Sequence, residues 1–278
     1  CLLAEGKYQV SRTGAQIPPL IDALMGRAAE AKDGATAAAL CSAVEDVGTL
    51  MAALPPVMHS KQLQAPQLAA LYFNDCHYVS VHLATLPLHY GPRMSELTGG
   101  MLSFMSAAVL LRDAGQAALS AVLAEQERQL MELLGGAHQF SLRRKQTAGL
   151  TCRKVVSAVL HSLKRFAAVL RPVLNAAAFV SSTASLLQAV CSRVVDDLLS
   201  VRDFDADESA ELPVILMPLV EEALAAFTSS ASRHDDAEQR MLCIALKSSA
   251  PAFQKLLVVV KLLQARLADI GTMWEAGE

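Results

Sequence analysis

Apolar residues recur at every third or fourth position through most of this 278-residue chain. The segment 35–54, ATAAALCSAVEDVGTLMAAL, shows the pattern through Leu40, Val44, Val47 and Leu50. Such spacing places apolar side chains along one face of an α-helix, whereas a half-buried strand requires strict alternation. The pattern therefore predicts a chain built of helices.

The composition also favours helices. Apolar residues make up 53% of the chain, yet aromatic residues make up only 5%. Ala and Leu, the best helix formers, are abundant, whereas residues that favour strands are comparatively sparse. We therefore expect an all-α protein without a sheet, an elongated antiparallel bundle or rod of roughly eight to ten helices, with helix above about 65% of residues.

Polar segments predict how the chain is divided. Residues 1–15 are polar without a clear period, and residues 16–278 are expected to form one continuous helical rod. The clearest loop lies at 136–149. We expect this loop to join two sub-bundles, about 16–135 and about 150–272.

Prolines predict where helices end. Because proline lacks a backbone N–H and clashes with the preceding turn, we expect helices to stop at Pro55-Pro56 and at Pro87, and a break at Pro172. The last long helix is expected to begin at Pro251, with Ser249 as its cap.

Charge and hydropathy argue against several classes of protein. The formal net charge of −3 provides no electrostatic footprint for nucleic acid. No run of 18 uninterrupted apolar residues occurs, so we expect no bilayer span. The chain begins at Cys1 without a signal pattern, and we expect it to be a fragment of a longer protein.

The cysteines are too widely separated to form CxxC metal or redox motifs. They are Cys1, Cys41, Cys76, Cys152, Cys191 and Cys243. Five of them lie within apolar helical patterns, where a free cysteine behaves as a small hydrophobe. We expect reduced thiols, as in a cytosolic protein, and a buried, unbridged Cys76.

The run NDCH at 74–77 collects the residue types of metal sites and catalytic triads. On a helix, however, neighbours diverge by about 100°. Cys76 shares an apolar stripe with its neighbours at three and four residues, whereas Asn74, Asp75 and His77 point elsewhere. No second ligand lies three or four residues away on the same face. We therefore expect no metal, no cofactor and no catalytic residue here, with Asn74 and His77 on a solvated or partner-facing side.

A second candidate surface is the basic face of the segment 154–166, KVVSAVLHSLKRF. Leu160 and Leu163 share one face, whereas His161, Lys164 and Arg165 share another. This basic face is either simply solvated or a partner contact. The acidic run DFDADE at 203–208 lacks the Gly and Glu positions of a calcium loop, so we expect an acidic turn that caps a helix.

Three blocks resemble the zeste-white ten family. PQLAALYFNDCHYVSVHLATL at 66–86 is similar to its hallmark helix, KVVSAVLHSLKRF to its Leu-His-x-Leu-Lys-Arg helix, and LLQARLADIGTMWEAGE at 262–278 to its Leu-x-Glu-Ile-x-x-x-Trp stretch. The matching positions are Pro66 to Ala70, Asn74, Cys76, Tyr78, His82, Leu83, Thr85, Leu86, Leu160, His161, Leu163, Lys164, Arg165, Leu267, Ile270, Trp274 and Gly277. Asp75 and Asp269 depart from the family residues.

The resemblance implies a non-enzymatic scaffold, a helical rod of the type found in multisubunit tethering complexes. Such a subunit acts with a RINT-type subunit and a large solenoid subunit at the endoplasmic reticulum, where it captures Golgi-derived vesicles and contacts SNAREs indirectly. In animals the family also joins Rod and Zwilch at kinetochores, where it recruits dynein and serves the spindle checkpoint. The implied location is cytoplasmic, peripheral at the endoplasmic reticulum through partners, with a kinetochore role in mitosis.

Three alternatives remain open from the sequence. One is another helical-rod tethering subunit. One is an all-α enzyme that uses Asp75, Cys76 or His77. The third is a lipid-binding helical domain that uses the basic run LRRK at 142–145. Separately, Trp274 lies on the apolar face of the last helix, and we expect it to be partly buried.

Overall fold

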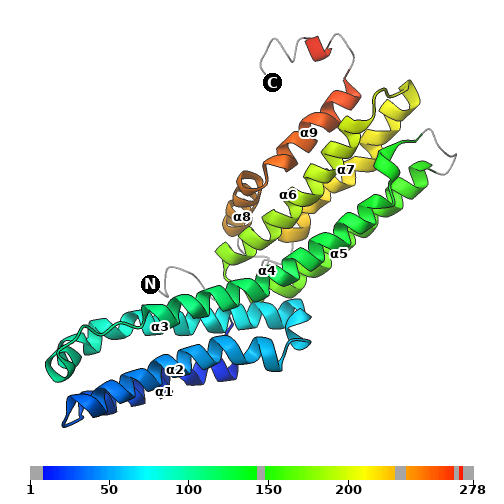
Figure 1. Ribbon diagram of the computed structural model, residues 1–278. Helices are drawn as coiled ribbons and strands as arrows, with labels where there is room; N and C mark the ends of the chain where they lie inside the picture. Colours follow the sequence, from blue (N-terminus) through cyan, green and yellow to red (C-terminus); the bar gives the residue numbers. More distant parts are fainter. Residues whose placement is uncertain (1–8, 143–147, 229–235, 266–268, 272–278) are drawn as a thin grey trace. The chain divides into compact units, whose positions relative to one another are not determined.

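Nine α-helices and two short 3-10 segments follow one another in the computed structural model, which describes residues 9–142, 148–228, 236–265 and 269–271 (Figure 1). Helices account for 86% of the structure, and the described ranges contain no strand. The expected all-α class is therefore confirmed. Cys1, the basic run 143–145 and Trp274 lie outside the described residues.

The chain divides into two compact units, which are described separately. Unit 1 comprises residues 1–122 with 172–175, and unit 2 comprises residues 123–171 and 176–278. The division falls inside helix α4 (Met105–Gly135) and not in the 136–149 segment where the sequence analysis placed a junction. The reason is that the first half of α4 buries Leu111 in the core of unit 1, while Leu130 is buried further along.

Unit 1 is built from α1 (Arg12–Ala29), α2 (Gly34–Met58), α3 (Pro66–Thr98) and the first half of α4. Four residues separate α1 from α2, so the two helices pack antiparallel along their length. Side-chain caps mark both helix starts, because Ser11 Oγ accepts from Gly14 N at 2.9 Å and Asp33 Oδ1 accepts from Thr36 N at 2.7 Å.

Prolines do not end α2 and α3, and these predicted boundaries were wrong. Helix α2 continues through Pro55 and Pro56 to Met58, and α3 continues through Pro87 and Pro92 to Thr98. A proline inside a helix costs about 3 kcal/mol, so packing must compensate. In α3 the flanking Leu86 and Met94 are fully buried in the unit 1 core. The helix ends instead at Gly99, whose φ of 69° is the left-handed conformation that glycine favours.

Helix α3 lies at the centre of unit 1. Its Tyr72 hydroxyl donates to Ala52 O of α2 at 2.8 Å, and His82 Nε2 lies 3.0 Å from Asp22 Oδ1 of α1. Helix α4 crosses it so closely that a Cβ added at Gly115 would lie 2.9 Å from Cys76 Cβ. Every other helix of the unit therefore contacts α3.

A buried polar cluster ties the start of the chain to α3. Asn74 Nδ2 donates to Gln9 O at 2.8 Å and to Val173 O at 2.7 Å, and Asp75 Oδ1 accepts from Ser11 N at 2.7 Å. Asn74 is only 2% exposed. Burial raises the pKa of the Asp75 carboxyl, and the Ser11 hydrogen bonds partly offset that rise. The expectation that Asn74 faces solvent or a partner was wrong, because backbone from residues 9–11 and 172–175 covers this side of α3.

Cys76 lies on the opposite side of α3. It is fully buried and free, as predicted, and burial raises the pKa of its thiol to about 12. Cys41, Cys152, Cys191 and Cys243 are also free.

Unit 2 contains the end of α4, α5 (Ala148–Leu170), α6 (Ala176–Ser200), α7 (Ala206–Thr228), α8 (Asp236–Ser249) and α9 (Pro251–Gln264). Helix α5 packs on α7, α6 packs on α8 and α9, and α7 packs on α9. The predicted break at Pro172 is confirmed between α5 and α6. Ser249 does not cap α9, because it belongs to the last turn of α8 and Ala250 holds the cap position without a side-chain bond.

The acidic turn before α7 forms a helix cap, as predicted. Asp205 Oδ1 accepts from Glu208 N at 2.8 Å, and Glu208 Oε2 accepts from Asp205 N at 3.1 Å. This reciprocal pair is a capping box. Glu208 Oε1 also accepts from Leu142 N at 3.1 Å, so the same buried carboxylate holds the segment after α4 against the start of α7.

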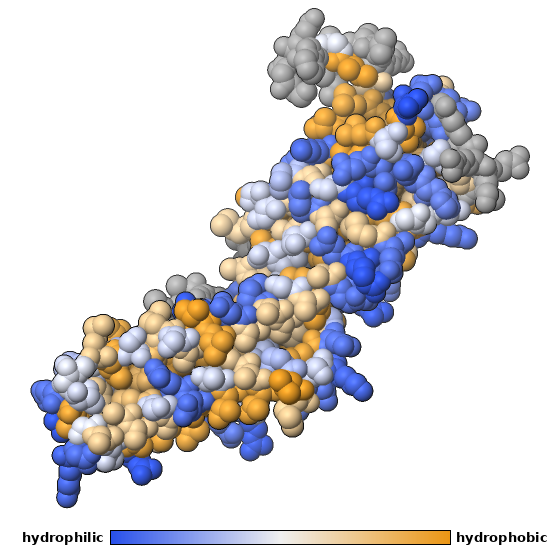
Figure 2. Space-filling model, in the orientation of Figure 1, coloured by the Kyte–Doolittle hydropathy of each residue, from blue (hydrophilic) through white to orange (hydrophobic). Residues whose placement is uncertain are grey.

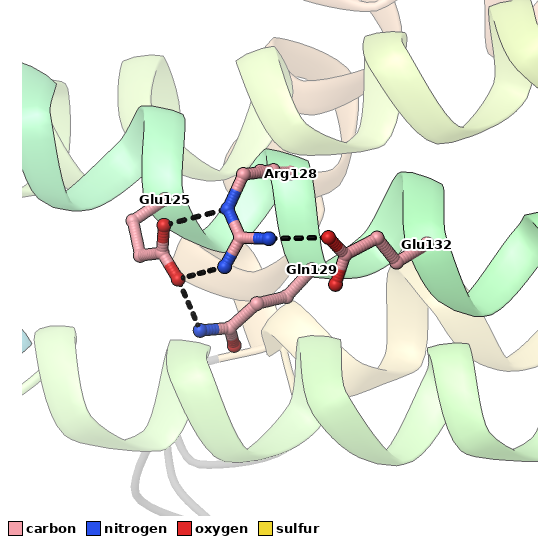
Figure 3. Close-up of polar contacts among 4 residues, drawn as sticks. All are labelled: Glu125, Arg128, Gln129 and Glu132. Carbon is pink, nitrogen blue, oxygen red and sulfur yellow. Dashed lines mark hydrogen bonds and ion pairs between the residues drawn. The ribbon is translucent and has the colours of Figure 1, made fainter.

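An ion-pair ladder lines the exposed second half of α4 (Figure 3). Arg128 donates to Glu125 at 2.7 and 2.9 Å and also pairs with Glu132, and Gln129 donates to Glu125 at 2.7 Å. The Arg128 hydrogen bonds lower the pKa of Glu125 to about 2. Spacings of three and four residues support a helix that has a long exposed face.

The close crossing at Gly115 predicts a matched pair of outcomes. Gly115→Ala should lower the free energy of unfolding by about 1–3 kcal/mol, because its new methyl group meets Cys76 and the α3 backbone. Gly26→Ala in α1 meets nothing within 4 Å and should be neutral or stabilising by up to about 1 kcal/mol. Urea unfolding followed by far-UV circular dichroism measures both. Equal effects at the two glycines would contradict a tight crossing.

The Asn74 cluster predicts a second outcome. Asn74→Leu should lower the free energy of unfolding by about 1–3 kcal/mol, because the carbonyl of the buried Val173 loses its amide donor. The control Gln67→Leu makes the same kind of change on an exposed part of α3 and should stay within about 0.5 kcal/mol of the parent. Thermal unfolding of both variants tests this, and a neutral Asn74→Leu would show that the cluster does not anchor the segment.

Candidate protein-interaction surface

The basic residues singled out on α5 lie together on its exposed side. His161, Lys164 and Arg165 are exposed, and Leu160 and Leu163 beside them are buried. The arrangement follows from helical spacing, because residues three and four apart share a face. The apolar face of α5 packs against α7, which leaves the basic side open.

A groove of about 410 Å³ runs between α5 and α7. Its α5 wall carries Arg153, Val156, Ser157, Leu160, His161 and Lys164, and its α7 wall carries Val214, Ile215, Pro218 and Glu222. The groove is therefore mixed in character, with apolar side chains at its base and charged groups along both rims.

Two ion pairs bridge the rims of this groove. Lys164 Nζ lies 2.7 Å from Glu222 Oε2, and Arg153 Nη2 lies 3.5 Å from Glu211 Oε1. The basic residues are 11 apart on α5 and the acidic residues are 11 apart on α7, which is about three helical turns. Helices α5 and α7 therefore run parallel and in register. Each pair is exposed and adds little stability, so its main effect is on the shape and charge of the surface.

The five residues predicted as one partner surface belong to two different units. His161 and Lys164 line the α5–α7 groove, and Arg165 is exposed beside them on α5. His77 belongs to α3 of unit 1, where it is half-buried and stacks on Phe73 with ring centroids 6.4 Å apart. Asn74 is buried, as described above. The candidate surface in unit 2 is therefore the α5–α7 groove with Arg165 at its edge.

Sequence reasoning missed the acidic half of this surface. Glu211 and Glu222 were not singled out, although their spacing of 11 residues matches that of Arg153 and Lys164. That shared spacing is the signal that could have revealed a parallel, paired arrangement. Pro218, which lines the groove from inside α7, gave no signal of its own.

The residues of the enzyme alternative are engaged in structural contacts. Asp75 accepts from Ser11 N, and Cys76 is buried against α4. A thiol whose pKa is raised to about 12 holds little thiolate at neutral pH, and the thiolate is the reactive form. Within the described ranges, no group of three or more His, Cys, Asp or Glu side chains is placed to hold a metal ion.

Comparison with known proteins covers both units. The family profile described as "Centromere/kinetochore protein zw10, C-terminal" matches residues 4–132, and the profile described as "ZW10 C-terminal helical domain" matches residues 154–278. The "Centromere/kinetochore protein zw10 homolog" of Rattus norvegicus is 26% identical over 225 residues, which cover 80% of this chain and 29% of that protein.

Two further homologues of the same description agree. The protein of Mus musculus is 24% identical over 80% of this chain and 28% of its own length, and that of Arabidopsis thaliana is 24% identical over 85% of this chain and 31% of its own length. The chain spans less than a third of each of these relatives. Because two C-terminal profiles of one family cover most of the sequence in order, the chain belongs to the ZW10 family, the zeste-white ten family, and corresponds to its C-terminal part.

Proposed function

We propose that this chain is the scaffold part of a non-enzymatic subunit, and that it acts by holding protein partners at kinetochores and at the endoplasmic reticulum. The observation that carries the proposal is the α5–α7 groove. It offers exposed charged rims over an apolar base, on two parallel helices that core packing holds in register. A rigid pair of helices with such a surface suits recognition of a protein segment better than it suits catalysis.

Family membership supports the kinetochore part of the proposal, since the relatives carry the description centromere/kinetochore protein. The finer part is that the subunit works in Golgi-to-endoplasmic-reticulum vesicle tethering. Its partners there are a RINT-type subunit and a large solenoid subunit, with indirect SNARE contact, and Rod and Zwilch are its partners at kinetochores. Its location is then cytoplasmic and peripheral at the endoplasmic reticulum, with recruitment to kinetochores in mitosis.

The proposal predicts that reversing the charge at one rim of the groove weakens the binding of partner subunits. In the tagged protein expressed from its own locus, Lys164→Glu with Arg165→Glu should reduce at least one co-purifying subunit by tenfold or more, because reversing two charges at one rim opposes a complementary partner. Quantitative mass spectrometry of affinity-purified complexes measures the loss.

A matched control changes the same charge elsewhere in unit 2. Lys247→Glu with Lys255→Glu alters two exposed lysines of α8 and α9 and should leave the co-purifying set unchanged. Equal protein abundance of both variants excludes unfolding as the cause. If the groove variant retains every subunit, the α5–α7 surface is not the partner site. If no subunit co-purifies even with the parent protein, the scaffold proposal itself fails.

A further inference from the structure

We propose that the α5–α7 groove receives an amphipathic helix of a partner protein, and that Lys154, His161 and Arg165 of α5 bind carboxylates along one edge of that helix. This inference rests on the proposed function, because it concerns a partner held at the same groove. It adds the chemistry of the partner segment and the residues that recognise it.

The cations of α5 fall into two rows that differ in their contacts. Arg153 and Lys164 face α7 and pair with carboxylates there. Lys154 and Arg165 are exposed, and within the described residues neither forms an ion pair or a hydrogen bond. In each row the two cations are 11 residues apart, which is about three helical turns. The second row therefore remains available to the charges of a partner.

His161 belongs to the same row as Lys154 and Arg165. It follows Lys154 by seven residues and precedes Arg165 by four, so the three side chains share one face of α5. His161 also lines the groove, which places this basic row beside the apolar base. Its imidazole can donate a hydrogen bond to a carboxylate. The basic row extends about 17 Å along the helix axis, so it can meet about three turns of a partner helix.

The neighbouring helices leave the basic row open. On one flank of α5, Ser162 Oγ accepts from Gln126 Nε2 of α4 at 2.9 Å, and on the other flank Lys164 pairs with Glu222 of α7. The basic row lies on the exposed arc between these contacts. Figure 2 shows hydrophilic surface, in blue, over the part of unit 2 where Figure 1 labels α5. A partner can therefore reach the basic row without displacing α4 or α7.

The groove also offers apolar surface to a partner. Val214 of α7 lines the groove and is 56% exposed, and Pro218 beside it is half-buried. Leu160 closes the base of the groove from α5. An amphipathic helix covers such a surface with side chains spaced by three and four residues, and its flanking positions reach the rims. The groove therefore fits a helix that has an apolar face next to its acidic edge.

Acidic residues on the outer side of α7 set the direction of the partner's charge. Asp207, Val214 and Glu221 are exposed and seven residues apart, so they share one face of α7. Among the described residues, neither Asp207 nor Glu221 has an ion-pair or hydrogen-bond partner. Their charges repel carboxylates from this side of the groove. An acidic edge is therefore favoured over α5 and opposed over α7, which fixes how a partner helix lies.

An anionic membrane is the alternative source of negative charge. By length and composition, α2, α4 and α6 are apolar enough to cross a membrane, contrary to the expectation from the uninterrupted-run criterion, but the groove lies between α5 and α7. A helix that lies on an anionic membrane carries Lys and Arg along its polar margins. Here a flat membrane that reached Lys154 and Arg165 would also meet Asp207 and Glu221 beside the same groove. The mixed charge favours a protein helix, because its two edges can carry different residues.

A photo-crosslinker in the groove tests what occupies it. In the tagged protein expressed in cells, p-benzoylphenylalanine replaces Val214, and mass spectrometry identifies the linked peptide. We expect a helical segment of a co-purifying subunit, with carboxylates four, seven or eleven residues apart as in the basic row. The same crosslinker at Met241, a 69% exposed residue of α8, should not link to this segment. A segment without an acidic edge, or no link in complexes that retain their subunits, overturns the inference.

An exchange of charges tests the assigned contact. Lys154→Glu with Arg165→Glu should reduce the crosslinked subunit by tenfold or more, because repulsion replaces attraction at two positions. Changing two carboxylates on the acidic edge of the linked segment to lysine should have the same effect. Combining both sets of changes should restore roughly half or more of the parent amount. If the combination restores nothing, the basic row does not bind the acidic edge.

The outcomes separate this inference from the proposed function. If Lys164→Glu with Arg165→Glu removes a subunit but the linked segment has no acidic edge, the groove is a partner site and the inference alone fails. If no groove variant removes a subunit, both fail. If the purified chain floats with vesicles of phosphatidylcholine and phosphatidylserine, and Lys154→Glu with Arg165→Glu abolishes flotation, the basic row contacts lipid and the inference is overturned. Circular dichroism and thermal unfolding check that each variant folds as the parent does.

Discussion

Unit 1 depends on the enclosure of α3. Asn74 and Cys76 are two residues apart, so their side chains point about 200° away from each other around the helix axis. Both are buried, Cys76 against α4 and Asn74 beneath the carbonyls of Gln9 and Val173. A helix covered on opposite sides cannot slide or rotate without leaving a buried amide unpaired or opening a cavity. The positions of α1, α2 and the start of α4 all follow from contact with this helix.

The same enclosure explains why prolines are tolerated. Pro87 and Pro92 lie in α3, where Leu86 and Met94 hold the chain on the core from both sides. The lost hydrogen bonds cost less than the packing that a break would remove. Proline thus bends or weakens a helix locally, but burial of the flanking residues decides whether the helix continues.

Unit 2 is organised differently, around parallel helices in register. Buried apolar residues of α5 pack on α7, and the rim pairs Lys164–Glu222 and Arg153–Glu211 align the two helices with the same offset. Because exposed ion pairs contribute little energy, the register of the two helices is a consequence of core packing. The ion pairs form where that register brings opposite charges together. The resulting surface combines fixed backbone geometry with charges that a partner can oppose, which is a requirement for specific recognition.

Sequence alone determined the helical class, the break at Pro172, the capping turn before α7 and the burial of Cys76, because these depend on spacing within one helix or on local turn chemistry. It also determined the family, through the residue blocks that resemble it. It could not place Asn74, whose burial depends on carbonyls 65 and 99 residues away, nor the ends of α2 and α3, which depend on what packs beside their prolines. It found the basic side of the α5–α7 groove but not the acidic side, since the pairing of two parallel helices is a contact between distant segments. A helical pattern shows which face of each helix is apolar, and only the tertiary structure decides which of these faces finds a partner within the chain.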